Sequence, residues 1–251
     1  MTTTTAAFTY RNTSWPVLDR TAEAHRRSWA MLAAPGEWWT GAERVSIAAE
    51  CRRASALADG LPDPGPGPAA LPDAAVFAIH KLIGDLPNVS REWYDETVNA
   101  EGMSDAHYIE LLGVVVHIWS IDEFHRALDI DLEPLPVPTP GQPTRIRPSG
   151  AKLHGSWPPT VWPDDLDERD ADIYDGADRA ANVRAAMSLH PDSVRWLSDL
   201  FDAHYLSWIE IGAEQESFRV LTRPQRELVA ARVSALNECF YLTISHVMLL
   251  G

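Results

Sequence analysis

Residues 104–128 read SDAHYIELLGVVVHIWSIDEFHRAL and contain an apolar run that extends from Tyr108 to Leu128. Ser104 is of the residue types that cap the N-terminus of a helix by accepting a hydrogen bond from its free N–H groups. The run behind it is long enough for a buried helix. We therefore predict a helix here that forms the core of the N-terminal part of the protein.

Helical periodicity recurs on both sides of this stretch, and the Ala-rich composition of several segments favours the same assignment. No segment alternates polar and apolar residues over enough positions to form a sheet. We therefore predict an all-α protein, a helical bundle. The further helices are expected at residues 41–58, 74–86, 89–100, 177–189, 192–211, 223–236 and 237–250.

Prolines separate two groups of helices. Nine of the 19 prolines lie between Glu133 and Asp165, and proline lacks the backbone N–H that a helix or a sheet requires. We predict an N-terminal helical half at residues 1–133, an irregular Pro-rich connector at 134–176 and a C-terminal helical half at 177–251.

The two halves share a short similarity. Aligning Glu43 and its neighbours with Glu227 and its neighbours superimposes two Ala-rich helices and places Ser55 opposite Cys239. Either an internal duplication or the general likeness of Ala-rich amphipathic helices accounts for this match, and the sequence leaves both open.

Charge and composition exclude several classes of partner. The formal net charge is −15, 45% of the residues are hydrophobic, and no Lys/Arg stripe is evident. Such a surface repels nucleic acid and anionic lipid. The first residues lack the basic and apolar regions of a secretory signal, and no run reaches the ~18 apolar residues of a spanning helix. We expect a cytoplasmic protein without nucleic-acid or membrane partners.

The chemistry-bearing stretch is residues 223–246, RPQRELVAARVSALNECFYLTISH. Asn237 is a good N-cap, so we expect a helix from Glu238 with Cys239 in its first turn, where the helix dipole favours thiolate over thiol. His246 follows seven residues later, two turns on and close to the same face. A base near a thiol is the arrangement that a nucleophilic cysteine needs.

This stretch resembles the alkylhydroperoxidase AhpD-like and carboxymuconolactone decarboxylase superfamily. The family signature is Cys-x-x-Cys-x-x-x-His at a helix start, with a Glu twelve residues before the first Cys. The matching residues are Glu227, Cys239 and His246, and Leu242 stands at the second cysteine. The flanking ERVSIAAE at residues 43–50 and the stretch that begins at Ser104 are also similar to the family.

The resemblance implies a helical peroxidase in which the second cysteine attacks peroxide, the first resolves it, and Glu and His relay protons. With Leu242 the full dithiol cycle cannot run. Our first hypothesis is an alkylhydroperoxidase-type oxidoreductase with Cys239 as a single reactive thiol, Glu227 and His246 as catalytic proton relay, and an external thiol as reductant. It requires no cofactor and no metal.

The second hypothesis is a family member without redox chemistry that binds, isomerises or decarboxylates a small organic molecule. Each site residue also has a structural explanation: Cys239 as a small buried hydrophobe, His246 as a hydrogen-bonded core or surface histidine, Glu227 as a solvated acid near a helix N-terminus. Their joint spacing favours the catalytic interpretation.

Two further features bear on partners. Acidic and His side chains gather along residues 104–128, a pattern that could form a metal site. We consider this only a minor alternative, because Asp122 and Glu123 are expected on the solvent side and no His-x-x-x-His spacing occurs. The apolar excess at residues 113–119, together with the family resemblance, predicts a homo-oligomer. The cluster consists of Glu110, His117, Asp122, Glu123 and His125.

Overall fold

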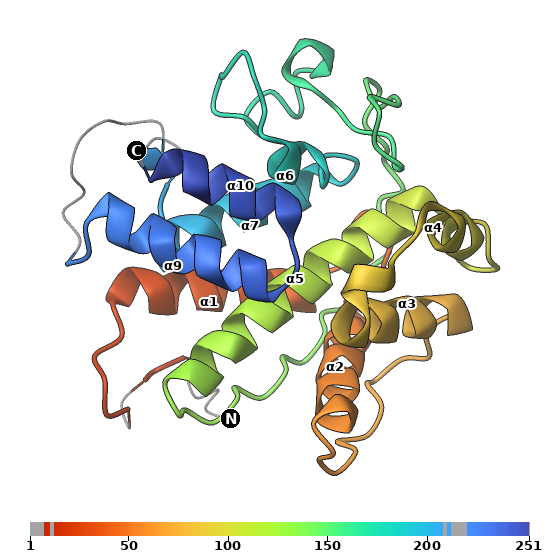
Figure 1. Ribbon diagram of the computed structural model, residues 1–251. Helices are drawn as coiled ribbons and strands as arrows, with labels where there is room; N and C mark the ends of the chain where they lie inside the picture. The colour runs from red at the N-terminus through yellow and green to blue at the C-terminus, as the bar shows by residue number, and fades with distance from the viewer. Residues whose placement is uncertain (1–7, 11–12, 208–209, 212–219, 251) are drawn as a thin grey trace.

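The computed structural model describes residues 8–10, 13–207, 210–211 and 220–250. Regular secondary structure in these ranges is helical apart from one isolated antiparallel bridge between Lys152 and Thr160, so the all-α prediction is confirmed (Figure 1). The helices are α1 (Asp19–Ala33), α2 (Gly41–Ala58), α3 (Asp73–Gly84), α4 (Arg91–Val98), α5 (Asp105–Ala127), α6 (Asn182–Ala185), α7 (Pro191–His204), α9 (Arg223–Leu236) and α10 (Phe240–Leu249), with short 3₁₀ turns at Leu86–Asn88 and Pro163–Asp165.

Helix α5 is the central element, as residues 104–128 predict. Ser104 Oγ accepts a hydrogen bond from the backbone N–H of His107 at 3.2 Å, which satisfies one of the free donors at the helix start. Figure 1 shows α2, α3 and α4 gathered on one side of α5, and α1, α7, α9 and α10 on the other. Because α5 is covered from several directions, its apolar residues extend around most of its circumference.

The main hydrophobic core joins α1, α2, α3, α5 and α7. Ile47 of α2, Leu111 and Ile118 of α5, and Leu200 of α7 belong to one buried cluster. Helix α7 approaches α5 closely at Gly113, where an added Cβ would lie 2.1 Å from Ser193 Oγ. The absence of a side chain at Gly113 is therefore what lets the two helices meet.

The Pro-rich segment is irregular and lies along the first helices. The backbone carbonyl of Pro134 accepts from Trp29 Nε1 at 2.9 Å, and the N–H of Thr139 donates to the carbonyl of Ala33 at 2.8 Å. Proline prevents this segment from forming helical hydrogen bonds, so its backbone groups form hydrogen bonds with residues of α1 instead.

Some predicted helix bounds are wrong. In place of a helix at residues 177–189 there is the four-residue α6, and the helix expected at 192–211 ends at His204, where Tyr205 takes a φ of −129° and a ψ of −100°. Residues 208–209 of that prediction lie outside the described part. Helix α1 was not predicted because Leu18, at its N-cap position, supplies no side-chain cap that would mark a start.

Candidate functional site

Helix α9 begins where the sequence predicts. Thr222 and Gln225 form a capping box: the Gln225 N–H donates to Thr222 Oγ1 at 3.4 Å, and the Thr222 N–H donates to Gln225 Oε1 at 2.9 Å. The residues that α9 buries are Glu227, Ala231 and Ser234, spaced along one face. The capped start therefore fixes Glu227 in the second turn with its carboxylate turned toward the protein interior.

The predicted helix start at Asn237 is wrong. Asn237 is the C-cap of α9, and its N–H donates to the carbonyl of Val233 at 3.0 Å. Glu238 then adopts a φ of 55°, in the left-handed region, and α10 begins at Phe240. Asparagine suits both ends of a helix, so its presence does not reveal which of two successive helices it caps.

Cys239 is the N-cap residue of α10 and not part of its first turn. Its backbone N–H donates to the carbonyl of Ser234 at 2.9 Å, and its carbonyl accepts from the N–H of Thr243 at 3.0 Å. The thiol makes no side-chain capping hydrogen bond and is half-buried. It thus lies at the positive end of α10 and is joined to both helices by backbone hydrogen bonds.

Glu227 and His246 lie in direct contact. Glu227 Oε2 is 2.8 Å from His246 Nδ1, the carboxylate is fully buried, and the imidazole side chain is 14% exposed. Because a carboxylate oxygen accepts, Nδ1 carries the proton in the neutral ring, and Nε2 keeps a lone pair. This arrangement leaves Nε2 available as a base, while the buried carboxylate would stabilise an imidazolium.

Tyr205, which sequence reasoning missed, completes this group. Its hydroxyl donates to Glu227 Oε1 and lies 3.5 Å from His246 Nδ1. Desolvation by burial, followed by the hydrogen bond to Glu227, raises the pKa of Tyr205 above its ordinary range, so the phenol keeps its proton and remains a donor. Tyr205 follows the last residue of α7, and no spacing in the sequence connects it with Glu227.

Leu242 of α10 and Cys239, its N-cap residue, lie at different distances from His246. Leu242 lies one turn before His246, whereas Cys239 lies two turns before it, roughly 10 Å along the helix axis. In the described part of the chain, hydrogen bonds join Glu227 to His246 and none joins Cys239 to either. The structure therefore brings Glu227 and His246 together. The thiol of Cys239 lies one turn further from His246 than Leu242 does.

The other cysteine is unsuited to reaction. Cys51 is 2% exposed in the core, and burial raises the pKa of its thiol above the ordinary range. A thiol that stays protonated and inaccessible is a poor nucleophile. Cys239 is consequently the accessible thiol of the described chain.

The acidic and His cluster on α5 is engaged in other contacts. Asp122 was expected on the solvent side, but it is buried and forms a bidentate ion pair with Arg52 at 2.8 Å. His117 Nδ1 and His125 Nδ1 each lie 2.7 Å from a carbonyl oxygen four residues earlier, on their own helix. Among the residues that the structure describes, no group of three His, Cys, Asp or Glu side chains could hold a metal ion.

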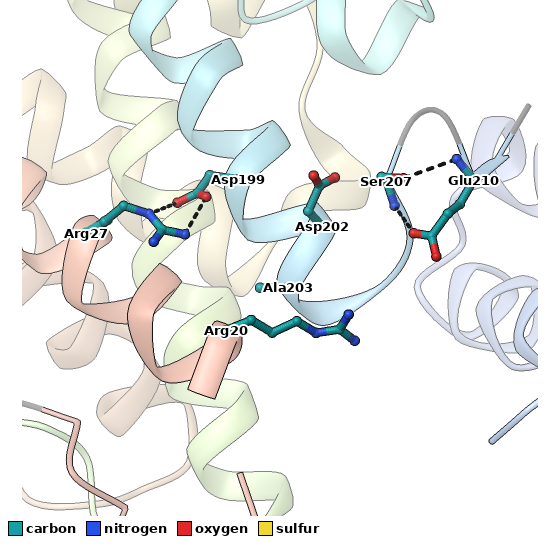
Figure 2. Close-up of a pocket in the computed structure, with 7 residues that line it drawn as sticks. All are labelled: Arg20, Arg27, Asp199, Asp202, Ala203, Ser207 and Glu210. Carbon is teal, nitrogen blue, oxygen red and sulfur yellow. Dashed lines mark hydrogen bonds and ion pairs between the residues drawn. The ribbon is translucent and has the colours of Figure 1, made fainter. Parts of the chain in front are cut away.

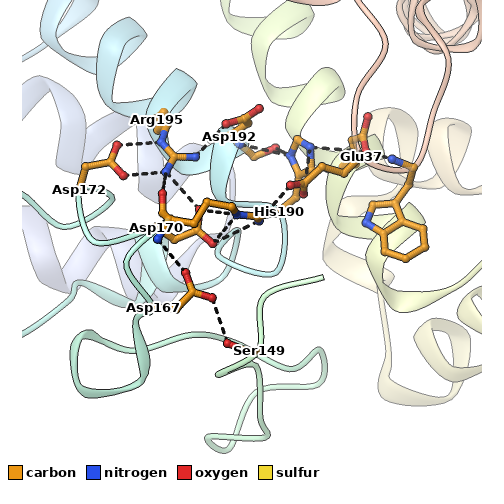
Figure 3. Close-up of polar contacts among 12 residues, drawn as sticks. Glu37, Ser149, Asp167, Asp170, Asp172, His190, Asp192 and Arg195 are labelled. Carbon is orange, nitrogen blue, oxygen red and sulfur yellow. Dashed lines mark hydrogen bonds and ion pairs between the residues drawn. The ribbon is translucent and has the colours of Figure 1, made fainter. Parts of the chain in front are cut away.

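Glu110, the remaining acid of that cluster with a buried side chain, belongs to a polar network in the interior. Glu110 Oε1 is 2.7 Å from Arg44 Nε, and Glu110 Oε2 is 3.4 Å from His190 Nε2. Glu37 lies 3.7 Å from the same His190 nitrogen, and burial raises its pKa to about 7. Glu37 also pairs with Arg169, which pairs with Asp170, and Asp170 in turn pairs with Arg195. Figure 3 shows these ion pairs together with those of Arg195 with Asp172 and Asp192.

Two surface cavities differ in character. One of about 330 Å³, lined by charged side chains of α1 and α7 and shown in Figure 2, contains the Arg27–Asp199 ion pair but none of the predicted site residues. Another, of about 580 Å³, lies between α3, α5 and the α9–α10 turn. Its lining includes Leu112, Val115, Trp119 and Leu236, and it reaches Glu238, the neighbour of Cys239.

Comparison of the sequence and the structure with models of protein families, with curated proteins and with solved structures finds no match in any of the three. No helix within the described ranges has the length and apolar character needed to traverse a bilayer.

Proposed function

We propose that this protein is an alkylhydroperoxidase-like oxidoreductase in which Cys239 is the single redox-active thiol and His246 moves the protons. The observation that carries the proposal is the 2.8 Å contact between buried Glu227 and His246 Nδ1, which leaves Nε2 available on the helix whose N-cap residue is Cys239. A carboxylate-held imidazole is a common general acid–base group in enzymes.

The reaction would proceed in two stages. The proton of the Cys239 thiol passes through solvent water to His246 Nε2, because the two groups are not in contact. The sulfur attacks the hydroxyl oxygen of the hydroperoxide, an S–O bond forms and the O–O bond breaks. The leaving alkoxide takes the proton back from His246 as an alcohol, so that thiol and hydroperoxide become sulfenic acid and alcohol. An external thiol then forms a mixed disulfide with release of water, and a second one restores Cys239 as a disulfide leaves.

The two-turn separation of Cys239 and His246 suits the first stage. In an in-line displacement the leaving oxygen lies beyond the attacked oxygen, so its proton donor belongs on the far side of the peroxide from the sulfur. Long side chains on a helix lean toward its N-terminus, and in this reaction Nε2 of His246 would lean toward Cys239. A hydroperoxide group lying between them would pass over Leu242.

The apolar cavity beside Glu238 would hold the organic part of the substrate. Its lining residues on α3 and α5 are mainly aliphatic or aromatic, with Ser120, Asn237 and Glu238 as polar members and no Lys or Arg. Such a cavity suits a neutral organic molecule better than a carboxylate. The partners we propose are accordingly a small organic peroxide and a soluble thiol reductant, with the reducing cytoplasm as the location.

One observation favours a second function. Leu242, and not a thiol, occupies the position one turn from His246, and the Glu227–His246–Tyr205 group is complete without Cys239. The same Nε2 could therefore act on a carbon acid in an isomerisation or a decarboxylation. In that case Cys239 would be a small packing residue at the helix end.

Cys239→Ser and His246→Gln separate the two functions. Each would be assayed with organic hydroperoxides and a dithiol reductant, and with a panel of neutral carbon acids. Under the first proposal both variants lose peroxide turnover. In His246→Gln, mass spectrometry should show that the sulfenic acid at Cys239 forms more slowly than in the wild type. Retained peroxide turnover in Cys239→Ser would exclude the thiol mechanism. Turnover of a carbon acid that requires His246 and survives Cys239→Ser would establish the second function.

A further inference from the structure

Helix α10 is unusual because it is rich in apolar residues and yet, within the described chain, covered on only one side. Its sequence FYLTISHVML contains no Asp, Glu, Lys or Arg, and none of its ten residues, all of which the structure describes, is buried. A helix with this many apolar residues normally packs against other elements on more than one side. Within the described chain α10 packs mainly against α9, and the hydrophobic clusters there include no residue of either helix.

Most of the exposed apolar side chains of this hairpin form two stripes, while Leu228 and Tyr241 are exposed beside them and Leu236 faces the cavity next to α5. On α9 the stripe consists of Val229 and Val233, one turn apart, on the side opposite buried Glu227 and Ala231. On α10 the stripe lies on the side opposite Leu242 and His246. We call these side chains the hairpin face; they are Val229, Val233, Phe240, Ile244, Val247 and Met248.

Both stripes lie on the sides of their helices opposite the buried contact of Glu227 with His246 and Tyr205. Figure 1 shows α9 and α10 running side by side, so the exposed sides of the two helices adjoin. Two adjacent helices with apolar stripes on a common side are half of a four-helix bundle. A second pair of helices with the same stripes is the complement that such a face fits.

We propose that the hairpin face binds the hairpin face of a second copy of this chain, so that two α9–α10 hairpins form a four-helix bundle about a twofold axis. A twofold contact places the same patch on both partners, and this patch is apolar throughout, so it is compatible with itself.

The area of the patch agrees with such a dimer. Phe240 is 79% exposed and Met248 77%, and the other members are about half exposed. With roughly 150–200 Å² for a large apolar side chain, the face offers on the order of 600 Å², at the lower end of what each partner contributes to a stable complex. Monomeric proteins seldom leave a contiguous apolar patch of this size uncovered.

Charge also favours a second copy at this place. The chain has a net charge of −15, so two copies repel one another across most of their surface. Residues 220–250 contain Arg223, Arg226 and Arg232 against Glu227 and Glu238, and none of the five belongs to the hairpin face. The two chains therefore meet where neither presents an acidic side chain.

The test is the mass of the protein in solution across micromolar concentrations, measured by sedimentation velocity. We expect twice the mass of one chain for the wild type. Phe240→Glu/Met248→Glu should raise the dissociation constant at least ~100-fold, because each copy would bury two unpaired carboxylates. Phe240→Ala/Met248→Ala, which adds no charge, should raise it ~10-fold.

The matched control is Val137→Glu, which adds the same charge at a side chain that is 86% exposed outside the hairpin. It should remain dimeric, and circular dichroism should show that all variants keep the wild-type helix content. A monomeric wild type, a trimer, or a dimer that persists in Phe240→Glu/Met248→Glu would each overturn the proposal.

Discussion

Glu227 Oε2 lies 2.8 Å from Nδ1 of His246, and the two residues come from antiparallel helices that a short turn joins. The buried carboxylate fixes which ring nitrogen carries the proton, and Tyr205 holds the other carboxylate oxygen. The pair is thus oriented before any substrate arrives, which is the condition for efficient proton transfer.

Replacing Glu227 with Gln should keep the shape of the site and remove its negative charge. Without the charge, the imidazolium that forms at His246 loses its stabilising partner, so we expect kcat to fall by about 10²–10⁴-fold with little change in KM. Tyr205→Phe, which removes only the hydroxyl, should cost about tenfold. Both variants would be measured by steady-state kinetics on the substrate that the assays above identify. A larger loss of kcat in Tyr205→Phe than in Glu227→Gln would show that Tyr205, and not Glu227, supports the base.

Leu242→Cys should create a Cys-x-x-Cys pair on α10. Positions three residues apart at a helix start are within the ~4.4–6.8 Å between Cα atoms that a disulfide spans. We expect peroxide turnover with a dithiol reductant to rise, and the oxidised protein to lose two hydrogen atoms in mass. Leu242→Ser, a polar control without a thiol, should give neither effect. If peroxide turnover rose equally in both variants, the new thiol at position 242 would not be the cause.

The stability of the fold should decrease as the pH falls below about 6.5. His25 Nε2 and His204 Nε2 lie 2.6 Å apart, so one donates and the other accepts, and neither can take a further proton without repulsion. Desolvation by burial first, and neighbouring histidines second, lower the pKa of His25 to about 3 and that of His204 to about 4. The unfolded chain takes up these protons at ordinary pKa values, so unfolding becomes easier by ~1.4 kcal/mol per pH unit for each histidine.

Glu37 has the opposite effect, because its pKa is raised to about 7 by burial, and the stability it contributes is lost as the pH rises from about 4.5 to 7. His204→Gln isolates the histidine contribution. Between pH 4.5 and 6.5 its free energy of unfolding, from urea titrations, should depend on pH less steeply than that of the wild type. An unchanged slope would show that His204 titrates normally in the folded protein.

Removing Glu110 should destabilise the protein strongly. Arg44 and Glu110 are 2% and 0% exposed and pair at 2.7 Å, so Glu110→Ala leaves a buried guanidinium without its counter-charge. We expect a loss of about 3–5 kcal/mol in the free energy of unfolding. Arg44→Met combined with Glu110→Leu should cost less than Glu110→Ala alone, because no charge then remains unpaired. Urea unfolding of the wild type, Glu110→Ala and the double variant would give the three free energies of unfolding to compare. The exposed ion pair of Arg91 with Asp95 supplies a control, because its loss should cost under about 1 kcal/mol.

Sequence determined the helical class of this protein and much of its layout. The apolar run behind Ser104, the capping residues Thr222 and Gln225, and the prolines after Glu133 are local signals, and local backbone energetics suffice to make α5, α9 and the irregular connector. The spacing of Glu227, Cys239 and His246 likewise singled out the stretch that contains the Glu227–His246 pair, because those residues lie on two consecutive helices.

Tertiary structure decided what no local signal contains. Tyr205 reaches Glu227 because α7 ends beside α9, and Asp122 is buried because Arg52 of α2 lies opposite it. Both contacts depend on how helices cross in space. Asn237 could cap either neighbouring helix, and the choice depends on how the turn packs between α9 and α10. The amino-acid sequence determines which residues can form helices and ion pairs, whereas packing selects their partners. The reason is that burying a polar group without a hydrogen-bond partner costs too much free energy.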